Sequence, residues 1–403
     1  SAATLTVPGD YATIQAAVDA AIAGDTIVIA AGTYPEQIKI DGKDLDLIGA
    51  GAGSTIIEAV DLVDRTTYSI TKWSGSSETI DPCIGIVGPA TVSISDLTVD
   101  GRELGPDHFY GIYYFDADGS VTGCEIAGII DASAPSRSKI VSVVAADGLR
   151  GSTDVTFSGN TIPDFQKGGI LVMGTSAACD LSGNEISDVP SSVLAGNGIQ
   201  ISYGATGTTS GNVVNGIGYT GEDWSGTGIL LFESGSVAMD GDEVLNCESA
   251  VNYSDWGWVH LHPSQVALDF ANLDLHDNAW PLGVQLSRDG SDVDVDITDC
   301  TIATSTGDGI DLWGTGLDPW GGTYYTGWDN GNLTASIDGC TITGADLDGI
   351  WTADLSGTAT NTSSVTVHEC SFSGNVSSAV NHNLPEEMDA SRNYWGVAGG
   401  PTF

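Results

Sequence analysis

The sequences DGIDLW, residues 308–313, and DGIWTA, residues 348–353, are two copies of one short phrase: a small residue, then Ile or Val, then an alternating pair. Each copy is a short strand that cannot bury its apolar face alone, so the copies must stack and the phrase predicts a solenoid. Its copies begin at Cys83, Tyr110, Gly168, Asn197, Thr227, Ser249, Leu282, Asp308, Asp348 and Ser378.

A second phrase precedes most copies, for example GNTI at residues 159–162 and GCTI at 339–342. Its apolar residues alternate with period two, which predicts a second strand in each coil. Its landmarks are separated by 24 residues between Asn160 and Asn184 and by 40 between Cys300 and Cys340. This spacing suits coils of short strands and is too short for strand–helix–strand units. Stacked Asn and Cys side chains are therefore expected to form internal ladders, with the cysteines as buried thiols.

The segment VPGDYATIQAAVDAAIAGDTIVIAAGTYPEQIKI, residues 7–40, resembles the opening of right-handed parallel β-helix proteins of the pectin-lyase-like superfamily, in which a helix caps the first coil. Asp10 is the candidate N-cap, and the apolar stripe that begins at Ile14 ends at Gly24. NYWGVAGGP, residues 393–401, resembles the final coil of many bacterial surface β-helix domains.

The fold class expected from the repeats and this resemblance is all-β, a right-handed parallel β-helix solenoid of about 10–13 coils with an N-terminal capping α-helix. One domain is predicted over residues 1–403. Its parts are a cap helix at 8–24, coils at 27–395, a long loop insertion at 314–332 and a C-terminal end at 393–403. No run of 18 apolar residues interrupts the chain, so no membrane insertion is expected.

The charge is strongly one-sided, with 54 acidic residues against 11 basic ones and a formal net charge of −43. Such a surface repels nucleic acid and anionic membranes. It favours a secreted or cell-surface protein of a marine or halophilic setting, where salt screens the repulsion, or one that binds Ca²⁺ or a neutral or cationic ligand. The segment DADGS, residues 116–120, makes Asp116 and Asp118 candidate calcium ligands; a solvated turn is the alternative.

Alignment of the repeated phrase predicts columns of outward-facing residues that are apolar and aromatic over several coils. Exposed aromatics in such number require either a cover of loops or a partner chain, or a ligand such as a sugar chain. The candidate substrate-binding residues are Tyr113, Phe232, Trp313 and Trp351 in the columns and Trp256, Trp320 and Trp328 in the loops.

Carboxylates gather around the same columns in the C-terminal third. Two carboxylates one or two coils apart, beside an aromatic platform, are the parts of a glycosidase site. Turn aspartates and a surface ion pair are the alternative interpretation. The candidate catalytic residues are Asp255, Arg288, Asp308, Asp311 and Asp354.

Enzyme families of this fold are matched only in fragments. GTYPE, residues 32–36, resembles a segment of pectin methylesterases, and GDGID, residues 307–311, resembles one of polygalacturonases, but the other motifs of both families are missing. Two classes stay open. One is an extracellular polysaccharide-binding or polysaccharide-degrading protein, a hydrolase or lyase acting on a polysaccharide or surface glycan in a lateral groove. The other is a noncatalytic adhesion or structural module of a larger cell-surface protein.

Overall fold

The computed structural model describes residues 2–60, 68–71, 77–104, 109–130, 141–144, 153–187, 194–221, 224–255, 264–286, 292–314, 332–354, 364–383 and 388–396. At positions 68–71, 77–79, 141–144, 314, 353 and 354 only the backbone is described. The chain divides into two compact units, Ser1–Gln200 and Ile201–Phe403.

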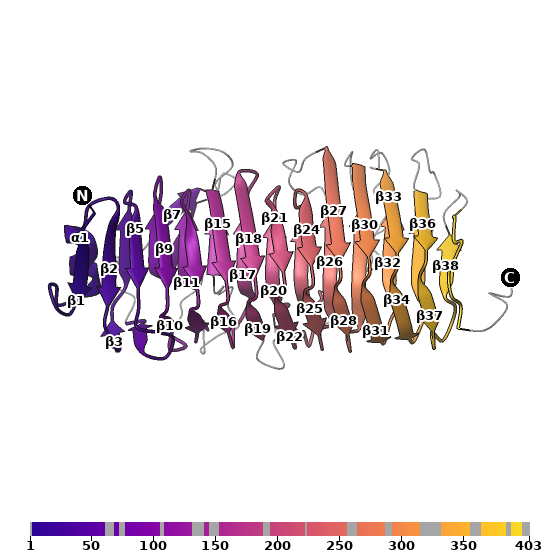
Figure 1. Ribbon diagram of the computed structural model, residues 1–403, viewed down its shortest axis with the longest axis horizontal. Helices are drawn as coiled ribbons and strands as arrows, with labels where there is room; N and C mark the ends of the chain where they lie inside the picture. Colours follow the sequence, from indigo (N-terminus) through magenta and orange to yellow (C-terminus); the bar gives the residue numbers. More distant parts are fainter. Residues whose placement is uncertain are drawn as a thin grey trace. The chain divides into compact units, whose positions relative to one another are not determined.

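Unit 1 consists of coils that pass in turn through three parallel sheets, here called A, B and C (Figure 1). Strand β20 (Asn197–Ser202) lies at the unit boundary. Sheet A contains β1 (Thr4–Val7), β2 (Asp25–Ile29), β5 (Leu45–Ile48), β9 (Thr91–Ser95), β12 (Asp118–Thr122), β15 (Thr153–Ser158) and β18 (Ala177–Ser182). Sheet B contains β3 (Gly32–Pro35), β6 (Thr55–Glu58), β10 (Thr98–Asp100), β13 (Glu125–Ala127), β16 (Thr161–Ile162) and β19 (Glu185–Ser187). Sheet C contains β4 (Ile38–Asp41), β8 (Ser77–Val87), β11 (Phe109–Phe115), β14 (Val141–Val144) and β17 (Gly168–Met173).

Unit 2 repeats the same path through sheets A, B and C. Sheet A contains β21 (Thr206–Ser210), β24 (Val237–Asp240), β27 (Gln265–Ala271), β30 (Asp292–Thr298), β33 (Leu333–Asp338) and β36 (Ser364–His368). Sheet B contains β22 (Val213–Asn215), β25 (Glu243–Leu245), β28 (Asp274–His276), β31 (Thr301–Ser305), β34 (Thr341–Ala345) and β37 (Ser371–Ser373). Sheet C contains β23 (Thr227–Phe232), β26 (Ser249–Asp255), β29 (Trp280–Leu286), β32 (Ile310–Gly314), β35 (Ile350–Asp354) and β38 (Val380–Asn383).

Parallel strands stacked coil upon coil make this fold a right-handed parallel β-helix, as the repeats predict. The repeated phrase forms sheet C, the second phrase forms sheet B, and sheet A adds a third strand to each coil. Alternation decides which side chains enter the core. In β30, for example, Val293, Val295 and Ile297 are buried, whereas Asp294 and Asp296 are exposed, as their spacing predicts.

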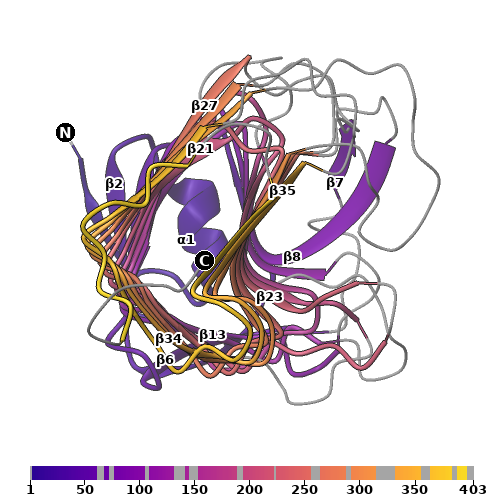
Figure 2. The same ribbon diagram turned by 90° about the vertical axis from the view of Figure 1, so that its right-hand side faces the viewer.

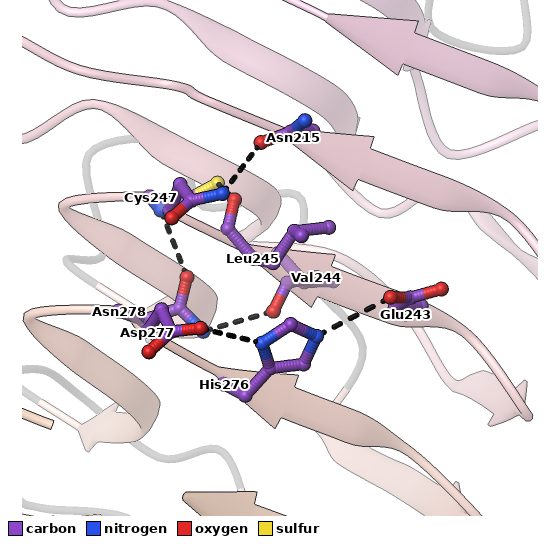
Figure 3. Close-up of polar contacts among 9 residues, drawn as sticks. Asn215, Glu243, Val244, Leu245, Cys247, His276, Asp277 and Asn278 are labelled. Atoms are coloured by element: carbon purple, nitrogen blue, oxygen red, sulfur yellow. Dashed lines mark hydrogen bonds and ion pairs between the residues drawn. The ribbon is translucent and has the colours of Figure 1, made fainter. Parts of the chain in front are cut away.

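The expected internal ladder is present before the sheet B strands. In unit 1, Asn184 Oδ1 accepts hydrogen bonds from the backbone N of Asn160 at 3.1 Å and from its Nδ2 at 2.9 Å. In unit 2, Asp242 Oδ1 accepts from Asn212 N and from Asn212 Nδ2, both at 2.8 Å. A second ladder of unit 2 lies at the turns after the sheet B strands, where Asn278 Oδ1 accepts from Cys247 N at 2.9 Å and its Nδ2 donates to Val244 O at 2.8 Å (Figure 3). These bonds satisfy buried polar groups that the turns would otherwise leave unpaired. The cysteines are all buried free thiols, as expected.

The predicted cap helix is present but shorter than residues 8–24. Helix α1 (Ile14–Ala20) begins at Thr13, whose side chain accepts from Ala16 N at 3.1 Å, so the prediction of Asp10 as N-cap is wrong. Asp10 instead closes the preceding turn by accepting from Thr6 N at 2.9 Å. In the end-on view α1 lies within the outline of the sheets of unit 1, where it covers the apolar end of the first coils (Figure 2). The coils also begin earlier than residue 27, because β1 already pairs with β2.

One hairpin departs from the regular coil. Strand β8 is longer than its neighbours and pairs antiparallel with β7 (Tyr68–Thr71), and the pair projects from sheet C of unit 1 (Figure 2). Ile80 on β8 forms a buried cluster with Tyr110 and Tyr113 on the outer side of β11. The hairpin therefore contributes to covering the outward column of unit 1.

Candidate acidic and aromatic site on sheet C of unit 2

Three aspartates meet on two neighbouring coils of unit 2. Asp308 lies just before β32, Asp311 lies within β32, and Asp348 lies just before β35. The parallel register pairs Ile310 with Ile350, so Asp308 and Asp348 occupy equivalent positions in successive coils. The backbone N of Asp348 donates to Asp308 Oδ1 at 2.7 Å. The exposed fractions of the three residues are 8%, 6% and 7%, so all three carboxyls are largely withdrawn from water.

Asp308 and Asp311 behave as a coupled pair. Burial raises the pKa of Asp311 well above its ordinary range, and the charge of Asp308 and a hydrogen bond between the two side chains raise it further. Burial also raises the pKa of Asp308, although the hydrogen bonds from Asp348 N and from Asp311 oppose the rise. Two carboxyls in contact cannot both ionise easily, so their proximity favours the protonated form of Asp311, whose pKa burial already raises.

Asp348 is positioned by side chains from the next coil. Its Oδ2 accepts a hydrogen bond from Asn381 Nδ2 at 2.8 Å, and its Oδ1 accepts one from Ser378 Oγ. Two donors aimed at a carboxylate fix its orientation. Asp348 is thus a hydrogen-bond acceptor held by the next coil.

Aromatic rings stand beside the carboxyls. Trp313 on β32 and Trp351 on β35 are half-buried and meet edge to face, with ring centroids 5.7 Å apart and an interplanar angle of 84°. Within the part of the chain that the structure describes, Trp313 Nε1, Asp311 Oδ1 and Gln285 Nε2 are buried and have no hydrogen-bond partner. Buried polar groups normally find partners, so two donors and a carboxyl oxygen left over at one place indicate a site prepared for a polar ligand.

The register of β29 corrects one column of the alignment. Leu282 pairs with Val251, so Gly283 and Gln285 take the two outward slots that the repeated phrase assigned to Gln285 and Ser287. Asp255 pairs with Leu286, which therefore takes the slot assigned to Arg288. Arg288 itself lies outside the described residues.

The structure brings together Asp308, Asp311, Trp313 and Trp351 from the predicted set, and it places other members elsewhere. Asp255 is fully buried at the end of β26. Burial raises the pKa of the neighbouring Tyr253, and the charge of Asp255 raises it further. Phe232 is half-buried on β23 and lies three coils before Trp313 in register, with Tyr203 edge to face at 5.6 Å.

Tyr113 was expected to be an exposed sugar contact, and this is wrong. It is 0% exposed, packed against Ile80 and edge to face with Tyr110 at 4.8 Å, because the β7–β8 hairpin supplies a cover that the repeat does not encode. Trp256, Trp320, Trp328 and the predicted insertion at 314–332, apart from its ends, lie outside the described residues, as does the side chain of Asp354.

Two residues outside the candidate catalytic and substrate-binding residues complete the site, and the sequence had placed one of them, Asp348, beside Asp308 and Asp311. Asp348 repeats Asp308 in the phrase DGI, and this repetition was the signal that pointed to it. Gln285 was displaced by the misaligned register, and its buried amide has no signal in a single sequence.

The candidate calcium ligands lie on separate elements of unit 1. Asp116 follows β11, has a positive φ of 48° and is buried, whereas Asp118 begins β12 and accepts a hydrogen bond from Asp154 N at 2.8 Å. Over the described residues, no group of three or more His, Cys, Asp or Glu side chains is arranged to hold a metal ion. Calcium binding at this turn stays a prediction.

A second polar cluster lies on the outer face of sheet B in unit 2 (Figure 3). His276 Nδ1 lies 2.9 Å from Asp277 Oδ2, and His276 Nε2 lies 3.2 Å from Glu243 Oε1. The hydrogen bond with Asp277 chiefly raises the pKa of His276, and the one with Glu243 adds to it. Each ring nitrogen faces its own carboxylate, which is the geometry of a surface ion pair.

The parallel coils define a right-handed parallel β-helix protein. The chain belongs to the family described as "Right handed beta helix region", whose model matches residues 82–266 and 148–316, together more than half of the chain. Curated protein sequences gave no match. In the part of the chain that the structure describes, no helix has the length and apolarity to cross a bilayer.

Two solved structures illustrate the likeness. The A-module of the Azotobacter vinelandii mannuronan C-5 epimerase AlgE4 is 18% identical, with 95% of this chain and 96% of that chain covered and a TM-score of 0.50. The catalytic domain of a GH87 alpha-1,3-glucanase, in complex with tetrasaccharides, is 14% identical with a TM-score of 0.54. The match covers 92% of this chain but 64% of the glucanase chain. At these identities the likeness concerns the fold alone.

Proposed function

We propose that the protein is a glycoside hydrolase acting on a polysaccharide at the Asp308–Asp311–Asp348 cluster. The observation that carries the proposal is the meeting of three buried carboxyls on neighbouring coils beside the Trp313 and Trp351 rings, with Asp348 held by Asn381 and the pKa of Asp311 raised by burial. Environments that push carboxyl pKa values apart are the means by which one site supplies both an acid and a base. The solved β-helix proteins similar in fold, an epimerase of mannuronan and a glucanase, lend support by analogy.

The chemistry follows from these roles. The Asp308–Asp311 pair donates its proton to the glycosidic oxygen as the bond from that oxygen to the anomeric carbon breaks. Asp348 takes a proton from a water molecule whose oxygen forms the new bond to the anomeric carbon. The proton on Asp348 then returns to the acidic pair through solvent, so the net reaction is addition of water across the glycosidic bond. The half-buried Trp313 and Trp351 rings supply apolar surface for a sugar ring.

The charge favours a neutral polysaccharide over a uronate polymer. Between residues 201 and 403 the sequence contains only two Lys or Arg residues, Arg288 and Arg392. Arg392 is paired with Glu369 at 2.9 Å. A polyanion brought to three aspartates with so little positive charge would be repelled at short range. Secretion, a saline setting and calcium stay predictions alongside this proposal.

A reducing-sugar assay against neutral glucans, alginate and pectate, with calcium and with chelator, tests the proposal. We expect cleavage of a neutral glucan, and a loss of turnover of about 10²- to 10⁴-fold in Asp311→Asn and Asp348→Asn. Asp294→Asn, an exposed carboxylate on sheet A, is the matched control and should leave turnover unchanged.

Other outcomes would give a different function. Unsaturated products from alginate or pectate would make the protein a lyase. Glycan binding without cleavage in the wild type would make it a noncatalytic recognition module, which is the alternative class left open by the sequence.

A further inference from the structure

An exposed apolar row borders the acid cluster of unit 2. Trp280 is 42% exposed at the start of β29, Leu347 is 43% exposed and Val376 is 71% exposed. Gly307 lies between the first two of them, since Leu347 N donates to Gly307 O at 3.3 Å, and Ser377 N donates to Leu347 O at 3.0 Å on the next coil. The row therefore runs across successive coils at the turn between sheets B and C.

The row is continuous with the proposed site. Asp308 directly follows Gly307, and Asp348 directly follows Leu347. Gly307 N donates to Ala279 O at 2.9 Å, which puts Trp280 level with Gly307 on the neighbouring coil, one residue before Asp308. Adjacent coils are about 4.8 Å apart, so the Trp280 ring borders the carboxyl cluster at roughly the spacing of one sugar unit.

The absence of a side chain at Gly307 makes room for the Trp280 ring. A Cβ atom added to Gly307 would overlap ring atoms Cε3 and Cζ3 of Trp280, so the indole lies flat against this backbone. Gly307 is not among the residues with a positive φ, so room for the ring, rather than backbone conformation, requires glycine here. The backbone of Trp280 is anchored by its N, which donates to Glu248 O at 2.9 Å.

Trp280, Leu347 and Val376 together expose apolar side chains along one edge of unit 2, and exposed apolar patches mark binding surfaces. We infer that Trp280 is the stacking platform of a sugar subsite next to the acid cluster, and that a neutral glycan chain lies along the row from Trp280 past Asp308 and Asp348 towards Leu347 and Val376. The inference rests on the proposed function, because it takes the glycan as the occupant. It adds the direction of the chain and a binding residue that no repeat position indicated.

The test uses linear neutral glucan oligosaccharides of two to eight units, of the linkage that the polysaccharide assay selects. Trp280→Ala is expected to raise KM about tenfold for the long oligosaccharides (about 1.4 kcal/mol), to change kcat less than about threefold, and to leave disaccharide kinetics unchanged. Trp224→Ala is the matched control, because Trp224 is 48% exposed and is not part of the row.

A second variant tests the position of the Trp280 ring rather than its presence. Gly307→Ala keeps the indole but displaces it, so it should reproduce the length-dependent rise in KM with an unchanged circular dichroism spectrum and Tm within a few degrees. Equal kinetics for Trp280→Ala, Gly307→Ala and Trp224→Ala on long oligosaccharides would overturn the inference while leaving the hydrolase intact. So would a change in molecular mass by light scattering on Trp280→Ala, because the row would then be a self-association surface.

The two proposals fail in different ways. A wild type that cleaves glucan but ignores the Trp280 change contradicts the subsite alone. A wild type that binds the oligosaccharides through Trp280 without cleaving them contradicts the hydrolase alone, and one that neither binds nor cleaves any neutral glucan contradicts both.

Discussion

The same outward slot of sheet C holds a packed aromatic ring in unit 1 and a carboxyl in unit 2. In unit 1 the slot on β11 holds Tyr113, which is fully buried beneath Ile80 of the β7–β8 hairpin. In unit 2 the slot on β32 holds Asp311, which is also buried but keeps an oxygen without a hydrogen-bond partner among the described residues. The position in the repeat thus determines that a side chain points outward from sheet C. The segments that cover this position then determine whether the side chain serves as packing or keeps a polar atom without a partner.

The largest expected effect concerns the packed slot. Tyr113→Ala removes a fully buried ring and should lower the free energy of unfolding by about 3–5 kcal/mol, with kcat for the glucan unchanged. Denaturant unfolding followed by circular dichroism measures the first quantity. Leu230→Ala, a half-buried residue in the same slot of β23, should cost roughly 1 kcal/mol. Similar costs at both positions would remove the distinction between a covered and an open slot.

Asn184 points into the core, so the effect of its replacement on stability is a reference for the outward positions of Tyr113 and Asp311. Asn184→Ala leaves Asn160 N, Asn160 Nδ2 and Phe157 O without the partner each now has, so unfolding should become about 1–3 kcal/mol easier. Asn246→Ala, whose Nδ2 makes an exposed hydrogen bond to Asn215 Oδ1, is the control and should change stability by less than about 0.5 kcal/mol. Thermal unfolding of both variants under one buffer provides the comparison.

The burial of Asp311 should lower the free energy of unfolding at neutral pH, whereas the burial of Tyr113 should raise it. Its raised pKa means that the folded state holds a proton that the unfolded state has released. The free energy of unfolding should therefore fall, by up to about 1.4 kcal/mol per pH unit, as pH rises from about 4 to the folded pKa. Asp311→Asn removes that slope, so the variant should gain Tm relative to wild type at pH 7 and lose the advantage near pH 4. Parallel Tm curves would show that Asp311 is ionised at no cost and is not the acid.

The smallest effect is expected at the ion pair of sheet B. The pKa of His276 is raised in the folded protein, so its contribution is fully present below about pH 6.5 and is lost as pH rises through the folded value. Because the three side chains are 26% to 51% exposed, His276→Gln should cost only a few tenths of a kcal/mol at pH 6 and nothing at pH 9. A larger or pH-independent loss would mean that the imidazole packs rather than pairs.

Periodicity predicted most of the fold, and the errors have physical causes. The alternation in β30 and the DGI phrases identified the strands, the buried faces and the pairing of Asp308 with Asp348. The register failed at β29 because Leu282 and Val284 both face inward, so a slip of two residues leaves the in-and-out pattern unchanged. Only contact with the neighbouring coil distinguishes the two registers, and a single sequence does not record it.

The site was predicted in part for a similar reason. Asp308, Asp311, Trp313 and Trp351 share columns of the repeat, so stacking alone brought them together. The cover over Tyr113 comes from a hairpin outside the repeat, and the protonation of Asp311 depends on burial from all sides. Such properties arise from three-dimensional surroundings, which residue spacing does not specify.

The buried cysteines make this protein convenient for site-directed labelling. All seven thiols are at most 5% exposed, and burial raises the pKa of Cys124 to about 11 and that of Cys179 to about 12. Maleimides and iodoacetamides react with accessible thiolates, so the native thiols need not be removed before a new cysteine is added. Val376→Cys would carry a single fluorophore beside the acid cluster of unit 2, on a scaffold whose own sulfur atoms stay silent.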